Sequence, residues 1–349
     1  MTCTIPLGVK PEVYKMQATE LTIPDKIFNF SGQTKFDTWK LREVFEKVGW
    51  SGYSDWLVNE IPFCMQRIRE LADAFPFWQR RKDTGRPAYS ERTLLISFMV
   101  KQYFNVTFRR VIGILKLFRT FFHLDRVPNY SLLSLKNSSK RWCQIWKRFH
   151  KFVLKPLPRR KCTIATDGTG FSSRKRSWRE TPYEVRAVEN WVKVHAAVEI
   201  DSFLVLNYEL TKSNVHESQM FEAVWNEFPD NVIPERSLAD AAYTSESCIQ
   251  SVQKRGATAF HDVKCNAVYV HHPETGYEKL VNFSKHWPNR FKKIKSKRAH
   301  IETAFGSMGE CFGHRIRCRN KIGRKNEVQA KICVHNFRLL AASSYMMRV

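Results

Sequence analysis

Residues 162–167 read Cys-Thr-Ile-Ala-Thr-Asp, a short run of apolar and β-branched residues that ends in a carboxylate. This pattern predicts a β-strand that carries an acid at its end. Two further strands are predicted at 191–200 and 203–210, with a hairpin turn at Asp201-Ser202. The chain therefore starts to form a sheet near residue 161.

Downstream of this hairpin the pattern alternates between helix and strand. Strands that alternate with helices predict an α/β layer fold. Residues 264–290 are predicted to be an irregular or β-rich insertion. The other expected elements are a helix at 216–228, a strand at 236–240, a helix at 244–255, a strand at 257–263, and helices at about 296–312 and 326–343.

The residues before this sheet read differently. Residues 1–50 are predicted to be an irregular arm with one helix near 38–48, and residues 51–155 an all-helical domain. Thr107 is suited to cap a helix, and Ser131 to start one that continues through Phe149. Helices on either side of the short Asn105–Thr107 turn resemble a helix-turn-helix, although a plain bundle has the same pattern. We favour DNA contact by this region, with packing or dimerisation as the alternative.

Composition bounds the class of protein. The 349 residues carry a formal net charge of +25, with 43% hydrophobic and 13% aromatic residues. That apolar content is typical of a globular core and excludes a disordered basic tail. A folded surface with this much positive charge indicates a polyanionic partner.

Other classes of protein are disfavoured. The sequence contains no apolar run of 18 residues, so it predicts no membrane span. The first 20 residues have no signal-peptide pattern. Nine scattered cysteines favour a reducing, cytosolic setting over a disulfide framework. One group of cysteines and histidines could instead bind zinc. The group lacks paired Cys-x-x-Cys spacing, so we interpret its members as buried thiols and surface histidines. Its members are Cys311, His314, Cys318, Cys333 and His335.

The positive charge is concentrated around isolated acids. The 41 residues between Asp125 and Asp167 hold 11 Lys and Arg and no acid. Residues 285–325 hold 13 Lys and Arg against Glu302 and Glu310 alone. Either run alone is typical of a solvated face, but together they suggest that basic residues hold a phosphate backbone beside metal-binding acids.

Three acids form a candidate constellation. Asp167 and Asp240 each end a predicted strand, and ligand sites in open α/β sheets lie beyond strand ends. Glu302 lies beside the apolar stripe of a late helix, one turn after Arg298, which can pair with it or reach a phosphate. Three carboxylates in a basic cleft suit two Mg²⁺ ions. Spacing alone leaves surface or capping acids as an equal alternative.

At these residues the sequence resembles the DDE transposases of insertion sequences, in the superfamily of insertion sequences four and five. The resemblance extends from about residue 45 to 343 as an ordered set of short blocks. The blocks are Gly85-Arg86-Pro87-Ala88-Tyr89-Ser90, Val127-Pro128-Asn129-Tyr130-Ser131, Thr166-Asp167-Gly168-Thr169-Gly170-Phe171, Asn214-Val215-His216-Glu217-Ser218, Ala239-Asp240-Ala241-Ala242-Tyr243, Arg298-Ala299-His300-Ile301-Glu302 and Val334-His335-Asn336-Phe337-Arg338-Leu339-Leu340.

The resemblance implies a ribonuclease-H-like catalytic domain at 156–349, with a mixed sheet, flanking helices and a short insertion. It implies Mg²⁺- or Mn²⁺-dependent cleavage at the ends of a mobile element and joining of 3′-OH ends to target DNA. Asp167, Asp240 and Glu302 take the metal-ligand and catalytic roles. Residues expected to contact DNA are Lys295, Arg298, Arg315, Arg317, Arg159, Arg160 and Lys161, with His216 and Tyr243 as accessory residues.

The implied setting is a cytoplasmic, nucleoid-associated protein that acts on double-stranded DNA, with the terminal inverted repeats and the target as partners. A homodimer is expected on DNA, with neither a membrane nor a small-molecule substrate.

Three positions depart from the family pattern, which has Asp where this chain has Glu217, Tyr where it has Lys295 and Lys where it has Gly309. A metal-dependent nuclease without transposition, or a catalytically silent, domesticated DNA-binding protein, is therefore an alternative to a transposase.

Overall fold

The fold is seen in a computed structural model that describes residues 41–77, 88–172 and 191–348. Residues 1–40 of the expected arm and the Gly85-Arg86-Pro87 part of the first family block lie outside these ranges. Within the described residues, no helix is both long and apolar enough to span a membrane.

A five-stranded sheet forms the centre of the second half of the chain. Its order is β3-β2-β1-β4-β5. The first three strands pair antiparallel, whereas β1–β4 and β4–β5 are parallel. The mixed sheet confirms the expected ribonuclease-H-like fold class. The strands are β1 Arg160–Ser172, β2 Trp191–Glu199, β3 Val205–Thr211, β4 Val232–Ala239 and β5 Thr258–His261.

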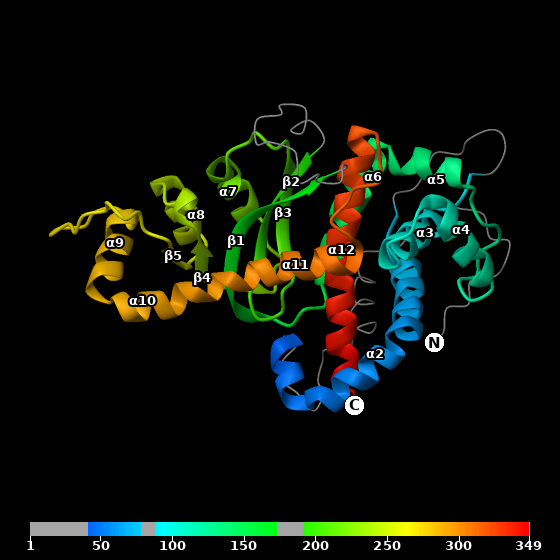
Figure 1. The fold of residues 1–349 in the computed structure, drawn as a ribbon, viewed down its shortest axis with the longest axis horizontal. Helices are drawn as coiled ribbons and strands as arrows, with labels where there is room; N and C mark the ends of the chain where they lie inside the picture. Colours follow the sequence, from blue (N-terminus) through cyan, green and yellow to red (C-terminus); the bar gives the residue numbers. More distant parts are fainter. Residues whose placement is uncertain (1–40, 78–87, 173–190, 349) are drawn as a thin grey trace, which may run out of the picture.

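Helices cover both faces of this sheet, with α7 and α8 on one side and α11 and α12 on the other (Figure 1). The Trp225 indole of α7 donates to Thr166 Oγ1 of β1 at 2.9 Å. Asn336 of α12 accepts from the Val205 amide at 2.9 Å and donates to the Val205 carbonyl at 2.8 Å. These buried polar contacts fix the helices on the strands. The helices are α7 Glu217–Trp225, α8 Glu246–Gln253, α11 His300–Phe312 and α12 Lys321–Met346.

The first half of the chain is helical, as expected. The Ser90 and Thr107 side chains cap α3 and α4 by accepting amide hydrogens. The expectation of one helix from Ser131 through Phe149 is wrong, because the chain breaks at Ser138-Ser139 and Ser139 takes the N-cap position of a new helix. The helices are α2 Leu41–Ala74, α3 Glu91–Tyr103, α4 Phe108–Leu117, α5 Tyr130–Asn137 and α6 Lys140–Leu154.

The long helix α12 belongs to both halves of the molecule. It packs against α2 and α6 as well as against the sheet. Glu327 of α12 pairs with Lys101 of α3 at 3.2 Å, and both side chains are buried. Arg338 of α12 pairs with Glu60 of α2 at 2.7 Å. The buried apolar residues of the two halves accordingly form one continuous cluster.

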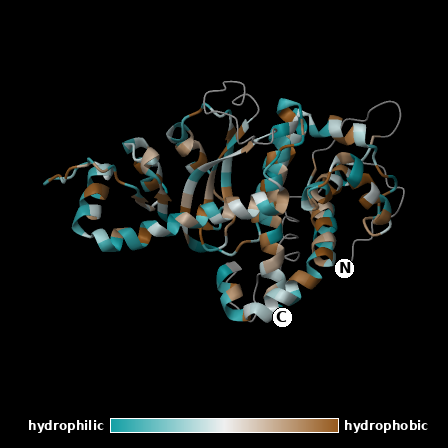
Figure 2. Cartoon of the chain, in the orientation of Figure 1, coloured by the Kyte–Doolittle hydropathy of each residue, from teal (hydrophilic) through white to brown (hydrophobic). Residues whose placement is uncertain are grey.

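The stretch 264–290, which was expected to be irregular or β-rich, is irregular over 264–275 but helical beyond that. It contains α9 Gly276–His286 and the start of α10 Pro288–Lys295, and α10 is largely hydrophilic (Figure 2). Thr275 accepts from the Glu278 amide while the Glu278 carboxylate accepts from the Thr275 amide, which is a capping box. Short 3₁₀ helices, η4 Ala241–Tyr243 and η5 Ser296–Ala299, complete the described elements.

Four histidines are deeply buried in the described residues: His150, His195, His261 and His335. His335 was expected on the surface, but it lies on the inner face of α12, where its Nε2 hydrogen-bonds with the Phe203 carbonyl at 3.0 Å. Burial lowers the pKa of each of the four to about 4.

These histidines predict an acid-sensitive fold. Since the folded pKa lies below the ordinary value of 6.5, the unfolded chain binds more protons as pH falls from 6.5 towards 4. Stability that is present above pH 6.5 is lost across that range, by about 2 kcal/mol per histidine between pH 7 and 5. Urea unfolding at both pH values measures this. His335→Gln should reduce the pH dependence by about one such increment, and exposed His271→Gln is the control. An unchanged dependence in His335→Gln would contradict the prediction.

Candidate metal centre

Two acids meet where β1 runs past the end of β4. The parallel register pairs Ala165 of β1 with Leu238 of β4. Two residues further along each segment, Asp167 lies beside Asp240, which follows the last residue of β4. The Asp240 carboxylate accepts from the Ala242 amide at 2.8 Å and thereby caps η4. The sheet register and this cap fix both acids. Asp240 follows the end of β4 as predicted, whereas the expectation that Asp167 ends its strand is wrong, because β1 continues to Ser172.

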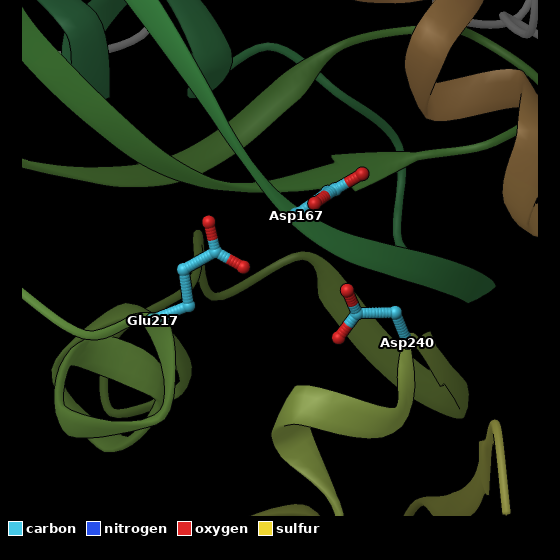
Figure 3. Close-up of side chains that lie close together, drawn as sticks. All are labelled: Asp167, Glu217 and Asp240. Carbon is cyan, nitrogen blue, oxygen red and sulfur yellow. The ribbon is translucent and has the colours of Figure 1, made fainter. Parts of the chain in front are cut away.

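A third acid completes a compact group. Glu217 is the first residue of α7, and one carboxylate oxygen each from Asp167, Glu217 and Asp240 lies within 4.8 Å of the others (Figure 3). Sequence reasoning placed Glu217 only in a family block and gave it no role. The available signal was its position at the start of a predicted helix that follows the β2–β3 hairpin.

The charge balance of this group favours a cation. Burial raises the pKa of Asp167 to about 6, and the nearby Asp240 and Glu217 charges add to the rise. The Gly168 amide, which donates to Asp167 at 2.7 Å, and Arg298 oppose it. Three half-buried carboxylates held this close repel one another unless protons or a cation neutralise them. Because all the donors are hard oxygens, the group fits Mg²⁺ or Mn²⁺.

Arg298 separates Glu302 from the three acids. Its guanidinium lies 3.3 Å from Asp167 and 3.9 Å from Glu302. It also lies 3.9 Å from Asp262, which in turn pairs with Lys295. The Glu302 side chain is 66% exposed and does not belong to the group of three. Its metal-ligand role stays a prediction.

The other expected DNA-binding residues occupy two regions. Arg315 and Arg317 follow α11, and the Arg317 guanidinium donates to the Asn105 carbonyl at 2.8 Å, in the turn between α3 and α4. Residues 159–161 lie at the start of β1. Asp167 lies six residues further along the strand than Lys161, so the two positions are roughly 20 Å apart. A basic contact there lies far from the acids, whereas Arg298 and Lys295 lie beside them.

The two accessory residues differ in position. His216 precedes α7 on the surface and its Nδ1 hydrogen-bonds with Ser218 Oγ at 2.8 Å. Tyr243 is buried against the acids, and its pKa is raised by burial and by the charges of Glu217, Asp167 and Asp240.

The alternative zinc set does not assemble. In the part of the chain that the structure describes, the acids Asp167, Glu217 and Asp240 are the only group of three or more possible ligands that converge. Cys333 and His335 are buried on α12, whereas His314 is exposed.

Comparison with known families gives one match. A family model described as a transposase DDE domain matches residues 158–337, slightly more than half of the 349 residues. The matched region begins just before β1 and ends within α12. It therefore contains the three clustered acids as well as Arg298 and Glu302.

Proposed function

The chain belongs to the DDE transposase family, and from this premise we propose that it cleaves DNA at the ends of an insertion sequence and joins the 3′-OH ends to target DNA. The observation that carries the proposal is the convergence of Asp167 and Asp240 at the edge of a ribonuclease-H-like sheet. Water breaks a phosphodiester bond and frees a 3′-OH, which then attacks a target phosphodiester and displaces a second 3′-OH.

The proposed cofactor is Mg²⁺ or Mn²⁺, with two ions per site. When bound, such ions stabilise the attacking and leaving oxygens of a phosphoryl displacement. Asp167 and Asp240 would supply oxygen ligands, and Glu302 would supply the third ligand of the predicted triad. The Arg298 guanidinium, which pairs with Asp167 and Glu302 in the free protein, would instead bind a DNA phosphate when DNA is present. Guanidinium groups form strong hydrogen bonds with phosphate.

The proposed partner is double-stranded DNA bearing the terminal inverted repeats, bound by a homodimer. The superfamily of insertion sequences four and five is the proposed branch of the family, and a nucleoid-associated cytoplasmic protein the proposed setting. Arg298 and Lys295 would hold the phosphates next to the acids, with Arg315 and Arg317 behind them. Arg159, Arg160 and Lys161 would contact a more distant stretch of the same DNA.

The test uses purified full-length protein, Mn²⁺ and two DNA fragments of equal length. One fragment carries the inverted repeats that flank the gene, and the other carries the same bases in scrambled order. Cleavage and strand transfer confined to the first fragment support the proposal. Equal nicking of both fragments indicates a metal-dependent nuclease without transposition.

A silent DNA-binding protein is the second candidate, and Gly309 favours it. The family pattern has Lys at this position, but here a Cβ atom would lie 1.9 Å from the His314 ring. A side chain at position 309 fits only if that ring moves. Because glycine has no side chain, this chain lacks the DNA contact that the family Lys is expected to make. Binding of the repeat DNA without Mn²⁺-dependent nicking would establish this second function.

A further inference from the structure

Glu217 is held in place by Lys193 of β2 and by its own position at the start of α7. Lys193 of β2 lies 2.9 Å from Glu217 Oε1 and donates to the Val215 carbonyl at 3.3 Å, just before α7. Its ammonium thereby anchors both the carboxylate and the chain that leads into the helix. Glu217 is also the first residue of α7, where the helix dipole favours a negative charge.

The backbone of β1 leaves room for this carboxylate. Gly168 follows Asp167 directly, and a Cβ atom at Gly168 would lie 2.7 Å from Glu217 Oε1. A real Cβ cannot approach an oxygen that closely, so any side chain at position 168 displaces Glu217. Glycine at this position therefore permits Glu217 to lie against Asp167.

A buried hydroxyl also faces this point. Tyr243 is 1% exposed, and within the described residues its hydroxyl makes no hydrogen bond of good geometry. The negative charges that act on this side chain are those of Glu217, Asp167 and Asp240. Glu217 is close enough to interact with this hydroxyl and helps to raise its pKa. A buried hydroxyl without a well-directed hydrogen bond is costly, and a bound ion's water is the kind of partner that satisfies it.

We propose that Glu217 is a third carboxylate ligand of the divalent metal centre formed with Asp167 and Asp240, and that Gly168 and Lys193 are its positioning residues. This inference rests on the proposed function, because it assigns a further ligand to the same centre. It adds Glu217 to the predicted triad of Asp167, Asp240 and Glu302.

The rival explanation is that Glu217 only forms an ion pair with Lys193. The charges around the group argue against that. Among the described residues, Lys193 and Arg298 are the cations paired with these acids, and Arg298 is shared with Asp262 and Glu302. Negative charge remains in excess after both pairs are counted, so the group retains an attraction for a divalent cation.

The test measures Mn²⁺ binding to the full-length protein without DNA, by calorimetry and by the EPR signal of free Mn²⁺. Glu217→Gln should weaken Mn²⁺ affinity by about tenfold to 100-fold. Gly168→Ala should weaken it in the same direction, because the added methyl group displaces the flexible end of Glu217 and leaves Asp167 in place. Glu310→Gln, the same change at an exposed site on α11, is the matched control.

Asp167→Asn, measured alongside, separates two kinds of failure. If Asp167→Asn abolishes Mn²⁺ binding while Glu217→Gln leaves it unchanged, the proposal for Glu217 is wrong and the proposed function stands. The same holds if Glu302→Gln weakens binding and Glu217→Gln does not. If Asp167→Asn also binds Mn²⁺ normally, the metal centre of the proposed function fails. Thermal unfolding of each variant without metal shows whether a lost affinity reflects a lost fold. If Glu217→Gln loses thermal stability together with Mn²⁺ affinity, the assignment of Glu217 as a ligand is overturned.

Discussion

Replacing Asp167 by Asn is expected to lower the rate of Mn²⁺-dependent DNA cleavage and strand transfer by roughly 10³-fold, which corresponds to about 4 kcal/mol of activation free energy. Asn keeps the size of the side chain but removes the charge at the centre of the three acids. Repeat-containing DNA should bind with unchanged affinity, since basic residues supply that contact. Gel-based cleavage and binding assays measure the two effects separately.

The same substitution should not weaken the fold. Because burial and the neighbouring acids raise the pKa of Asp167 to about 6, its ionised form is unfavourable in the folded state at neutral pH. The free energy of unfolding is therefore expected to stay the same or to rise in Asp167→Asn. Asp230→Asn is a matched control, because Asp230 precedes β4 on the surface whereas Asp240 follows it in the centre. Unchanged strand transfer in Asp167→Asn would refute the catalytic assignment.

Replacing Glu327 by Gln is expected to lower the free energy of unfolding by about 3–5 kcal/mol. Glu327 pairs with Lys101 at 3.2 Å, and its second oxygen accepts from the amides of Arg317 and Cys318 at 3.0 and 2.9 Å. Lys101 lowers the pKa of Glu327 against the effect of burial. Neutral Gln leaves the Lys101 ammonium buried without a counter-charge, which costs more than the lost hydrogen bond alone.

Urea unfolding at neutral pH measures this effect. The exposed Glu310→Gln variant, which makes the same chemical change, should shift the free energy of unfolding by no more than about 0.5 kcal/mol. A Glu327→Gln protein as stable as the parent chain would mean that the buried pair contributes nothing to holding α3 on α12. Glu327→Gln combined with Lys101→Met should recover part of the loss, because the pair is then removed from both sides.

The sequence could predict the strands and the two strand-end acids because both depend on local patterns. The strands predicted at 191–200 and 203–210 match β2 and β3 within one or two residues. Asp167 and Asp240 converge because β1 and β4 are parallel and in register, although β1 continues past Asp167 to Ser172. No comparable rule connects a helix start to a strand end, so Glu217 was missed: its distance from Asp167 depends on how α7 packs on the sheet.

Two errors in the predicted helices have different origins. The capping box at Thr275 and Glu278 is visible in the sequence, yet the few apolar residues around it do not favour a helix by periodicity. The break at Ser138-Ser139 depends on tertiary contacts: Asn326 of α12 donates to the carbonyls of Asn137 and Ser139 at 2.7 and 3.0 Å. Those carbonyls are available because the helix stops there.

The packing of α12 against both halves decides how this chain can be dissected. A fragment that begins at residue 156 would lack α2, α3 and α6 and expose the apolar side of α12 that faces them, along with the unpaired charges of Glu327 and Arg338. Such a fragment should aggregate when expressed alone. The helical half is equally incomplete without α12. Work on either half is best done on the intact chain with point substitutions.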